Sequence, residues 1–354
     1  MPANNNRAAC AIPIPRYQHV VLAHGGGGQL TADLVHGLFV PAFSNEVLSQ
    51  LEDQATLNIP LGSAQWRLAF TTDAFTVCPV FFPGGDIGRL AVFGTVNDLA
   101  VGGAVPLYIS AAFILEEGLP LTDLERVVQS MREACVETSV QLVAGDTKVV
   151  ERGKGDQVFI TTSGVGLVPE TVRLSIHNAK PGDRVIVSGT LGDHGIAVMV
   201  ARHGLDFDPP PQSDAAPVID LCRAVLSAAT AVRVMRDPTR GGVAATCIEL
   251  AEASQVGVEL EEEMLPVRPS VHAVCEILGV EPLHIANEGK VVAIVGPEEA
   301  DAVLRTMRAH PLGRDAALIG KVVEEHRGMV TVRSRIGGHR ILLRPAGEQL
   351  PRIC

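Results

Sequence analysis

Residues 86–101 read DIGRLAVFGTVNDLAV, and this stretch decides how the first half of the chain folds. Its apolar residues recur at helical spacing, and Asp86 is placed to cap the helix that they predict. Asp98 occupies a position where this spacing calls for an apolar residue. A buried carboxylate without a partner is strongly destabilising. Asp98 therefore needs a cation or strong hydrogen-bond donors beside it.

Strands and one further helix surround this segment. The patterns predict strands over 66–73, 105–115, 140–148 and 158–168 and an amphipathic helix over 124–138. Asp73 ends the first of these strands and Asp146 lies near the end of the third. Together with Asp98, they give three carboxylates on three separate elements, an arrangement that suits Mg²⁺. The alternative is that each carboxylate caps a helix or a turn.

The turn Pro181-Gly182-Asp183 opens a second unit, and we place the domain boundary near residue 170. Beyond it the patterns predict strands over 185–189 and 291–295, a hairpin within 327–344, helices over 218–233, 269–278 and 300–307, and two helices after the turns at 192–195 and 237–242. A length of 354 residues also favours two domains. We therefore expect a loose leader (1–16), an N-terminal domain (17–169), a C-terminal domain (170–340) and a tail (341–354).

Composition excludes several classes of protein. A net charge of −11 argues against broad contact with nucleic acid or an anionic membrane, because either needs a basic face. The seven cysteines are scattered without Cys-x-x-Cys spacing, which does not fit a structural zinc site. Neither a signal peptide nor an apolar run of membrane length is visible. We therefore expect reduced thiols in a cytoplasmic protein.

The chain ends in Pro351-Arg352-Ile353-Cys354, beyond the last strand-like run at 340–344. Proline and glycine without apolar periodicity separate the two, which predicts a flexible arm. The eleven residues 344–354 span at most roughly 35 Å, enough to bring a thiol from a domain surface into a cleft. The alternative is that a terminal cysteine is incidental.

A run of four glycines, Gly25, Gly26, Gly27 and Gly28, follows a short apolar segment. Such a run lets the backbone approach a phosphate closely, or it forms a plain hinge. The absence of a following Gly-Lys-Ser/Thr excludes a Walker-type loop.

Four segments together resemble the ATP-site motifs of the aminoimidazole-ribonucleotide-synthetase-like (PurM-like) superfamily, which includes selenophosphate synthetase and thiamine-monophosphate kinase. They are Thr71-Thr72-Asp73, Asn97-Asp98-Leu99-Ala100, Gly145-Asp146-Thr147 and Asp237-Pro238-Thr239-Arg240-Gly241-Gly242. From about Val20 to Cys354, the chain is similar to one branch, the carbamoyl dehydratases of hydrogenase maturation. The residues that single out this branch are the glycine run, Gly192-Asp193-His194-Gly195, Asn287-Glu288-Gly289-Lys290 and, above all, the terminal tetrapeptide.

The resemblance implies a two-domain α/β (α+β) fold. The N-terminal domain would bind ATP and contribute strands to a barrel shared across a homodimer, the C-terminal α+β domain would cover the ATP, and the tail would be flexible. ATP and Mg²⁺ are the implied cofactors, with Asp73, Asp98 and Asp146 as metal ligands. The implied nucleotide-binding residues are the four glycines, Asn97, Thr147, Arg240, Gly241 and Gly242.

The resemblance also implies a reaction and its partners. Cys354 would receive a carbamoyl group from the carbamoyltransferase HypF, and ATP-dependent dehydration would convert the thiocarboxamide to a thiocyanate. The cyano group would then pass to iron on a HypC–HypD complex, on its way to a [NiFe]-hydrogenase.

Several side chains suit this chemistry. Lys148 would contact phosphate or stabilise the oxygen as it is phosphorylated, or else form a surface salt bridge. Glu288 and His194 are both candidates for the base that removes the amide protons, although a histidine near a helix cap is more often structural. Arg240 would clamp phosphate or hold its turn.

Two other functions stay open at this point. A superfamily kinase or synthetase of the selenophosphate-synthetase type would act on a free small molecule with an inert tail. A non-catalytic binding protein would keep an ATP site only for folding, but such a protein has no need of the ordered Asp, Lys and Glu residues.

Overall fold

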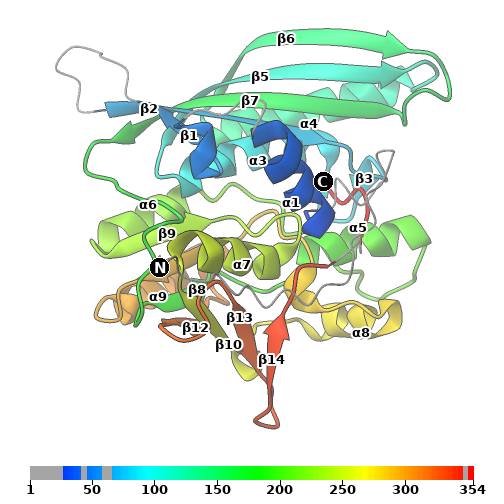
Figure 1. Cartoon of the computed structure of the whole chain (residues 1–354). Coiled ribbons are helices and arrows are strands. Elements are labelled where there is room, and N and C mark those ends of the chain that lie inside the picture. Colours follow the sequence, from blue (N-terminus) through cyan, green and yellow to red (C-terminus); the bar gives the residue numbers. More distant parts are fainter. Residues whose placement is uncertain (1–26, 41–45, 58–65, 346–349) are drawn as a thin grey trace.

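The computed structural model describes residues 27–40, 46–57, 66–345 and 350–354, so the predicted leader (1–16) lies outside the described residues. A five-stranded sheet of order β1-β2-β7-β5-β6 forms the first half (Figure 1). Its strands are β1 (Ala55–Leu57), β2 (Trp66–Phe75), β5 (Val105–Glu116), β6 (Gln141–Val150) and β7 (Val158–Pro169). The four predicted strands of this half are thus confirmed, with small shifts at their ends.

Two helices, α3 (Ile87–Val101) and α4 (Leu121–Thr138), cover one face of this sheet. Asp86 caps α3 as predicted, because its Oδ1 accepts hydrogen bonds from the backbone N–H groups of Gly88 (2.8 Å) and Arg89 (3.1 Å). The spacing predicted that one side of this helix is buried, but the buried surface extends nearly all the way round it. Every residue of α3 is buried apart from Arg89 and Asp98, since the helix lies between the sheet and the second half of the chain. Asp98 is therefore a polar group at an opening in an otherwise apolar contact.

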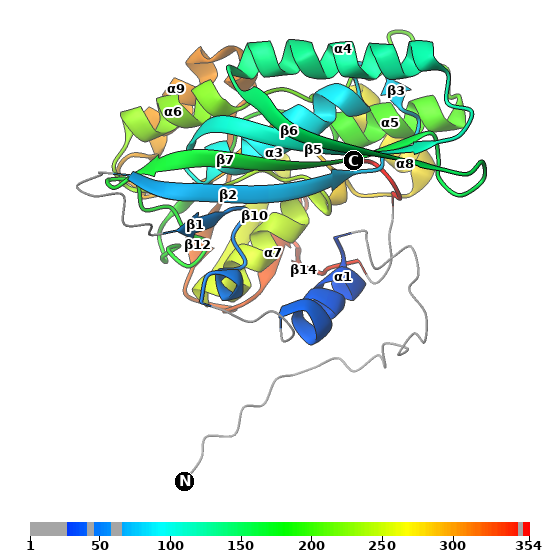
Figure 2. The same ribbon diagram turned by 90° about the horizontal axis from the view of Figure 1, so that it is seen from above.

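The opposite face of the same sheet is bare of described helices (Figures 1 and 2). Side chains alternate between the two faces along each strand. Phe70, Tyr108 and Ile114 are exposed on this outer face, and β6 is exposed along nearly its whole length. The outer face therefore carries exposed apolar side chains that no described helix covers.

A seven-stranded sheet of order β14-β13-β10-β12-β8-β11-β9 forms the second half. Its strands are β8 (Arg184–Val187), β9 (Val232–Arg236), β10 (Gly257–Glu261), β11 (Val292–Val295), β12 (Ala317–Val323), β13 (Val330–Arg333) and β14 (His339–Leu342). Its helices are α5 (Asp193–His203), α6 (Ile219–Ala228), α7 (Gly242–Ser254), α8 (Pro269–Leu278) and α9 (Ala300–Ala309). The hairpin predicted within 327–344 is confirmed, because β13 and β14 pair antiparallel.

Two parts of this half were predicted wrongly. The helix expected over 218–233 ends at Ala228, because Val232–Arg236 pairs with β11 as a strand. Strands β10 and β12 were not predicted. Both lie inside the sheet, where pairing on two sides decides the conformation of a short segment.

Short elements complete the chain. They are α1 (Gln29–Leu34), the π-helical turn Val35–Phe39, the two-residue strands β3 (Phe81–Phe82) and β4 (Gly85–Asp86), and the 3₁₀ turns Leu48–Gln50, Glu262–Met264, Pro282–His284 and Pro311–Gly313. Among the described residues, no helix has both the length and the apolar character needed to cross a membrane.

Candidate active site

Five carboxylates from five elements converge between the two sheets, and we call them the carboxylate cluster. They are Asp53 before β1, Asp73 on β2, Asp98 on α3, Asp237 after β9 and Glu288 before β11. The charges of Asp237, Asp73 and Asp53 all act on Asp98. Both halves of the chain thus contribute negative charge to one site.

Hydrogen bonds and one ion pair hold part of the cluster. Thr71 Oγ1 donates to Asp98 Oδ2 over 2.8 Å, and the Ala74 N–H donates to Asp73 Oδ1 over 2.8 Å. Arg236 Nη2 lies 2.6 Å from Asp53 Oδ1. These partners leave the cluster with more carboxylates than the cations beside it can neutralise.

Burial and mutual repulsion raise the pKa values of these groups. The pKa of Asp98 lies well above its ordinary value, because burial and then the charges of Asp237, Asp73 and Asp53 disfavour the carboxylate. Burial likewise raises the pKa of Asp237 to about 6, against the attraction of Arg236. Burial, followed by the charges of Asp73 and Asp237, raises the pKa of Glu288 well above its usual range, and Arg240 opposes this shift.

This donor set fits Mg²⁺. Carboxylate oxygens are the ligands that Mg²⁺ prefers, and the excess negative charge favours a cation. Over the part of the chain that the structure describes, no three Asp, Glu, His or Cys side chains are already arranged to hold a metal ion. That agrees with an ion that keeps several waters and takes further oxygens from phosphate.

A cavity of about 530 Å³ opens beside the cluster. Cluster residues Asp53 and Asp237 line it together with Arg236, Arg240 and Thr31. Its volume is in the range of small-molecule sites. The cavity therefore joins a basic wall, supplied by two arginines, to the edge of the carboxylate cluster.

The two glycine-containing segments meet at this cavity. A Cβ atom on Gly27 (φ +72°) would lie 3.0 Å from the backbone oxygen of Arg240, and one on Gly241 (φ +81°) would lie 3.3 Å from the oxygen of Gly27. Only glycine allows this backbone conformation and this close approach. Gly241 and Gly242 also begin α7, whose N-terminal N–H groups favour an anion. Gly28 follows in the same segment, whereas Gly25 and Gly26 lie outside the described residues.

Glu288 is held through its backbone, while one oxygen of its side chain lacks a hydrogen-bond partner in the described structure. Glu288 N donates to Asp214 Oδ1 over 3.1 Å, and Lys290 Nζ lies 3.0 Å from Asp214 Oδ2 in a buried ion pair. Glu288 Oε1 is buried without a hydrogen-bond partner among the described residues. An orphaned buried acceptor beside other carboxylates points to a ligand.

The side chain of Asn97 is hydrogen-bonded inside the protein, and its predicted role in nucleotide binding stays a prediction. Its Nδ2 donates to the carbonyl oxygens of Ala216 (3.0 Å) and Glu288 (3.2 Å), and its Oδ1 accepts from Val218 N (2.8 Å). The side chain is buried and both of its amide hydrogens are used inside the protein. Asn97 therefore fixes the loop that holds Glu288.

Asp146, Thr147 and Lys148 are not brought to the cluster within this chain. They lie on β6, which β5 and β7 separate from β2, a distance of about 14 Å at ordinary strand spacing. The registers place Asp146 in a row with Ala112, on the exposed outer face. Asp73 lies in the adjacent row, which faces α3. Lys148 Nζ pairs with Asp146 Oδ2 over 2.7 Å. Within the single chain, Lys148 thus forms the surface salt bridge that was the alternative to a phosphate contact.

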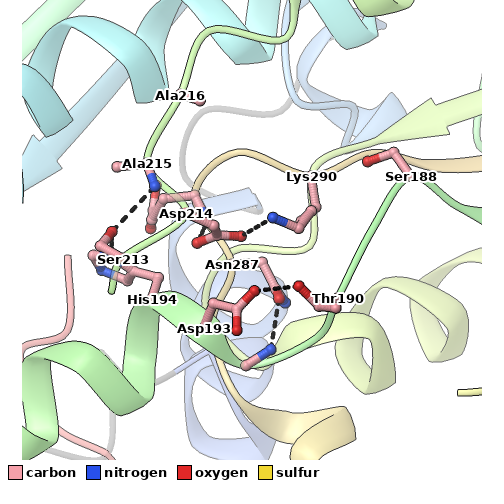
Figure 3. A network of polar contacts seen from close by, with 12 residues as sticks. Ser188, Thr190, Asp193, His194, Ser213, Asp214, Ala215, Ala216, Asn287 and Lys290 are labelled. Atoms are coloured by element: carbon pink, nitrogen blue, oxygen red, sulfur yellow. Dashed lines mark hydrogen bonds and ion pairs between the residues drawn. The ribbon is translucent and has the colours of Figure 1, made fainter. Parts of the chain in front are cut away.

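His194 contacts the end of the chain. It is fully buried at the start of α5, and its Nδ1 lies 2.8 Å from Ser213 Oγ (Figure 3). Its Nε2 lies 2.9 Å from the carbonyl oxygen of Ile353. Because a carbonyl only accepts, Nε2 carries the hydrogen and Nδ1 accepts from Ser213. Burial lowers the pKa of His194, in keeping with this neutral form.

The last four residues are docked beside α5 on their own chain (Figure 1). Thr76 N donates to the Cys354 carboxylate over 2.9 Å, Cys78 N donates to Arg352 O over 3.3 Å, and Ile353 is buried. The predicted arm thus reaches a defined place at the end of β2. Its mobility stays a prediction.

Three residues of the site were missed by sequence reasoning. Asp53 lies in a short segment before a three-residue strand, and Asp214 lies in a proline-rich loop that gave no pattern. Asp237 belongs to a quoted motif, yet its proximity to Asp98 depends on the packing of two domains. Only that motif gave a signal in the sequence.

Comparison with known proteins agrees with this geometry. Residues 51–168 match the family model of the AIR synthase related protein, N-terminal domain, and residues 180–333 match that of its C-terminal domain. The carbamoyl dehydratase HypE of Cupriavidus necator is 52% identical over 333 residues, 94% of this chain and 94% of the relative. That of Bradyrhizobium diazoefficiens is 53% identical over 336 residues, 95% of this chain and 96% of the relative.

Solved structures show the same likeness over nearly the whole chain. A chain of the HypE–HypF complex matches with a TM-score of 0.82 at 49% identity, covering 88% of this chain and 99% of that one. Hydrogenase maturation protein HypE in complex with ATP matches with a TM-score of 0.79 at 44% identity, covering 95% and 100%. The chain therefore belongs to the HypE family of carbamoyl dehydratases and has the two-domain fold of the AIR synthase related proteins.

Proposed function

We propose that this protein is an ATP-dependent carbamoyl dehydratase that acts on its own C-terminal cysteine. S-carbamoyl-Cys354 would become S-cyano-Cys354, the source of a cyanide ligand for the iron of a [NiFe]-hydrogenase. The observation that supports this most directly is the docked terminus. Cys354 is held at Thr76, the residue that follows β2, and β2 carries Asp73 of the carboxylate cluster three residues earlier.

The reaction needs a better leaving group than an amide oxygen. The carbamoyl oxygen attacks the γ-phosphorus of ATP, the bond from that phosphorus to the ADP oxygen breaks, and ADP leaves. Removal of one N–H proton gives an O-phosphoryl imidate. Removal of the second N–H proton and cleavage of the C–O bond release phosphate and leave the S–C≡N group.

The cavity beside Arg240 and Gly241 is our candidate for the ATP site, and a related HypE has been solved with ATP. The N-terminus of α7 and Arg240 would hold phosphate oxygens. Asp73 and Asp98, with Asp53 and Asp237, would hold Mg²⁺. When bound, Mg²⁺ neutralises charge on the phosphates during phosphoryl transfer.

Glu288 is the better candidate for the base. Its Oε1 is buried and has no hydrogen-bond partner in the described structure, so this oxygen is available to accept a proton from the carbamoyl nitrogen. Both ring nitrogens of His194 are already engaged, one by Ser213 and the other by the tail. Nε2 already carries a hydrogen, so His194 would have to lose the hydrogen bond that Ser213 donates to Nδ1 before it could accept a proton.

We also propose a homodimer that shares the five-stranded sheet. Its outer face is apolar, exposed and bare of described helices, as expected of a surface that closes against a second copy. In such a barrel Asp146, Thr147 and Lys148 of one subunit would serve the site of the other. The metal-ligand and phosphate roles predicted for them would then be filled across the interface.

The partners follow from the reaction. HypF would load the carbamoyl group, as the solved HypE–HypF complex suggests, and a HypC–HypD complex would accept the cyano group. A reactive thiol that must stay reduced agrees with the cytoplasm.

Mass spectrometry of the C-terminal peptide tests the proposal. After incubation with HypF, carbamoyl phosphate and Mg-ATP, Cys354 should first gain a carbamoyl group and then lose one water. Replacing ATP with a non-hydrolysable analogue in the second step should stop the reaction at the carbamoyl adduct. A Cys354→Ala chain that still accepted the group would contradict the proposal.

The two other functions give different results in the same experiment. A kinase or synthetase that acts on a free small molecule would keep its activity after deletion of residues 351–354. A non-catalytic binding protein would bind ATP without turnover in every combination of partners.

A further inference from the structure

The terminal tetrapeptide is held mainly through its backbone. Arg202 of α5 donates from Nη1 to the carbonyl oxygen of Pro351 (2.5 Å) and from Nη2 to that of Arg352 (2.6 Å). Its Nε donates to the carbonyl oxygen of Cys78 over 2.8 Å, which fixes the guanidinium between the tail and the loop after β2. One planar fork thus binds two successive carbonyls of the arm.

The terminal carboxylate has its own binding site. Thr76 donates to one carboxylate oxygen of Cys354 from its backbone N–H (2.9 Å) and from its hydroxyl (3.2 Å). A carboxylate at this oxygen strengthens both hydrogen bonds relative to an ordinary peptide carbonyl. A neutral peptide carbonyl at this position would accept the same two hydrogen bonds more weakly.

Side chains before the cysteine add selectivity. Ile353 is buried in the same apolar core as Phe75 and Ile160. Arg352 forms an ion pair with Asp156, and its Nε donates to the carbonyl oxygen of Thr76 over 2.9 Å. Arg352 also has a left-handed backbone (φ +52°), which a non-glycine residue keeps only when its surroundings impose it.

His194 completes these contacts at the carbonyl of Ile353, and its ring packs edge-on against Phe82 with centroids 5.4 Å apart. Ser213, whose Oγ also accepts from Ala215 N, holds the other ring nitrogen (Figure 3). The imidazole is thus oriented by one loop and points its N–H at the tail.

We propose that Thr76, Arg202 and His194 form a socket that recognises the C-terminal carboxylate and backbone of the arm and holds Cys354 for dehydration. The three are positioning residues and take no part in the bond changes. The inference rests on the proposed function for its purpose, but the socket itself is testable without any turnover.

Protection of the Cys354 thiol from alkylation measures docking directly. The rate of iodoacetamide labelling at Cys354 is followed by peptide mass spectrometry in the full-length protein. The labelling rate of a synthetic peptide of residues 350–354, divided by the rate in the protein, gives a protection factor. This protection factor corrects for the intrinsic reactivity of a cysteine beside a carboxylate. We expect protection of at least about tenfold, since several hydrogen bonds must break together to release the arm.

Adding one glycine after Cys354 is the sharpest variant, because it changes no side chain. It replaces the carboxylate at Thr76 with a neutral peptide carbonyl, which weakens both hydrogen bonds, so protection, measured against the matching six-residue peptide, should fall at least about threefold. Dehydration of the carbamoylated chain should slow at least about tenfold. Thr76→Val should lose part of the protection, whereas Thr76→Ser should keep it.

His194 has a matched pair of variants. His194→Phe keeps an aromatic ring against Phe82 but loses the donor to Ile353, so it should lose protection. His194→Gln keeps an N–H donor and should recover it in part. A role in proton transfer alone would lower dehydration and leave protection unchanged in both variants, which would overturn the assignment. Arg327→Ala, in the exposed connection between β12 and β13, is the control and should match the unmodified chain.

The outcomes separate the socket from the proposed function. An unmodified chain without protection, or a glycine-extended chain protected as well as the unmodified one, overturns the socket. An extended chain that loses protection as expected yet dehydrates at the normal rate overturns its role in positioning. If protection follows the pattern above but the loaded unmodified chain never loses water, the socket stands and the proposed function fails.

Discussion

Carboxylates on the two faces of the five-stranded sheet have pKa values that are shifted in opposite directions. Asp98 and Asp73 lie on the helix-covered side, where burial raises the pKa of both and neighbouring carboxylates raise that of Asp98 further. Asp146 lies on the outer side, where the hydrogen bond from Lys148 lowers its pKa. The carboxylates on the helix-covered side outnumber the cations beside them in the same chain, whereas Asp146 on the outer side is paired with Lys148.

The difference teaches that one chain forms only part of the predicted site. Alternation along a strand puts neighbouring rows on opposite faces, so no small movement brings Asp146 to Asp98 in the same subunit. In the homodimer that we propose, a second copy against the outer face would supply these residues without refolding either strand. The predictions below test this division, from the largest expected effect to the smallest.

Glu288→Gln should have the largest effect. It removes the proposed base from the inward side, so the rate of thiocyanate formation should fall about 10²- to 10⁴-fold. ATP binding should change little, because the cavity walls stay intact. Quenched-flow mass spectrometry of carbamoylated protein gives the rate, and calorimetry gives the affinity. Glu263→Gln, at an exposed turn, is the matched control. A Glu288→Gln chain as active as this control would exclude Glu288 as the base.

Mixing two inactive variants tests whether the outer face serves the partner. Asp98→Asn and Asp146→Asn homodimers should each be strongly impaired. If Asp146 acts across the interface, unfolding the two together and refolding them should restore about a quarter of normal activity, because half of the dimers are hybrids with one intact site of two.

The control for this experiment is a mixture of Asp98→Asn with Asp73→Asn, both on the inward side. In a hybrid of these two variants, one site carries Asp98→Asn and the other carries Asp73→Asn. Neither site is intact, so no activity should return. Activity that returns equally in both mixtures would contradict the division between the two faces.

Asp237→Asn should stabilise the protein when nucleotide and Mg²⁺ are absent. Its carboxyl pKa is about 6 in the folded protein and 3.8 in the reference state. The folded state therefore binds the proton more tightly, and stability is lost as the pH rises from about 4 through 6. The asparagine should thus raise the free energy of unfolding by about 1–3 kcal/mol at pH 8 and by much less at pH 4. Urea unfolding at the two pH values measures this, and an equal gain at both would contradict it.

Asp146→Asn should have the smallest effect on the stability of a single subunit. The ion pair with Lys148 is exposed, and exposed pairs contribute little. The midpoint of urea unfolding at low protein concentration should match that of the unmodified chain within error. A clear loss of stability would mean that Asp146 has a structural role within its own subunit.

Sequence reasoning recovered elements whose signal is local. Asp98 was found because a carboxylate interrupts helical spacing, and the order of strands and helices around it followed from periodicity. Asp237 and Asp214 act on the site through packing between domains, which no local pattern encodes. For Asp146, the motif was visible, but the side of the sheet it faces depends on register. Asn97 shows the reverse case, since a residue in a recognised motif holds a loop.

The covalent attachment of the docked arm has a kinetic consequence. Cys354 follows Leu342, the end of β14, by only twelve residues, so the thiol never leaves the neighbourhood of the sheet. A tether of this length maintains a local concentration in the millimolar range however dilute the protein is. Dehydration is then first order in loaded chains and insensitive to dilution. Flux through the enzyme is set by how often each chain is reloaded and emptied.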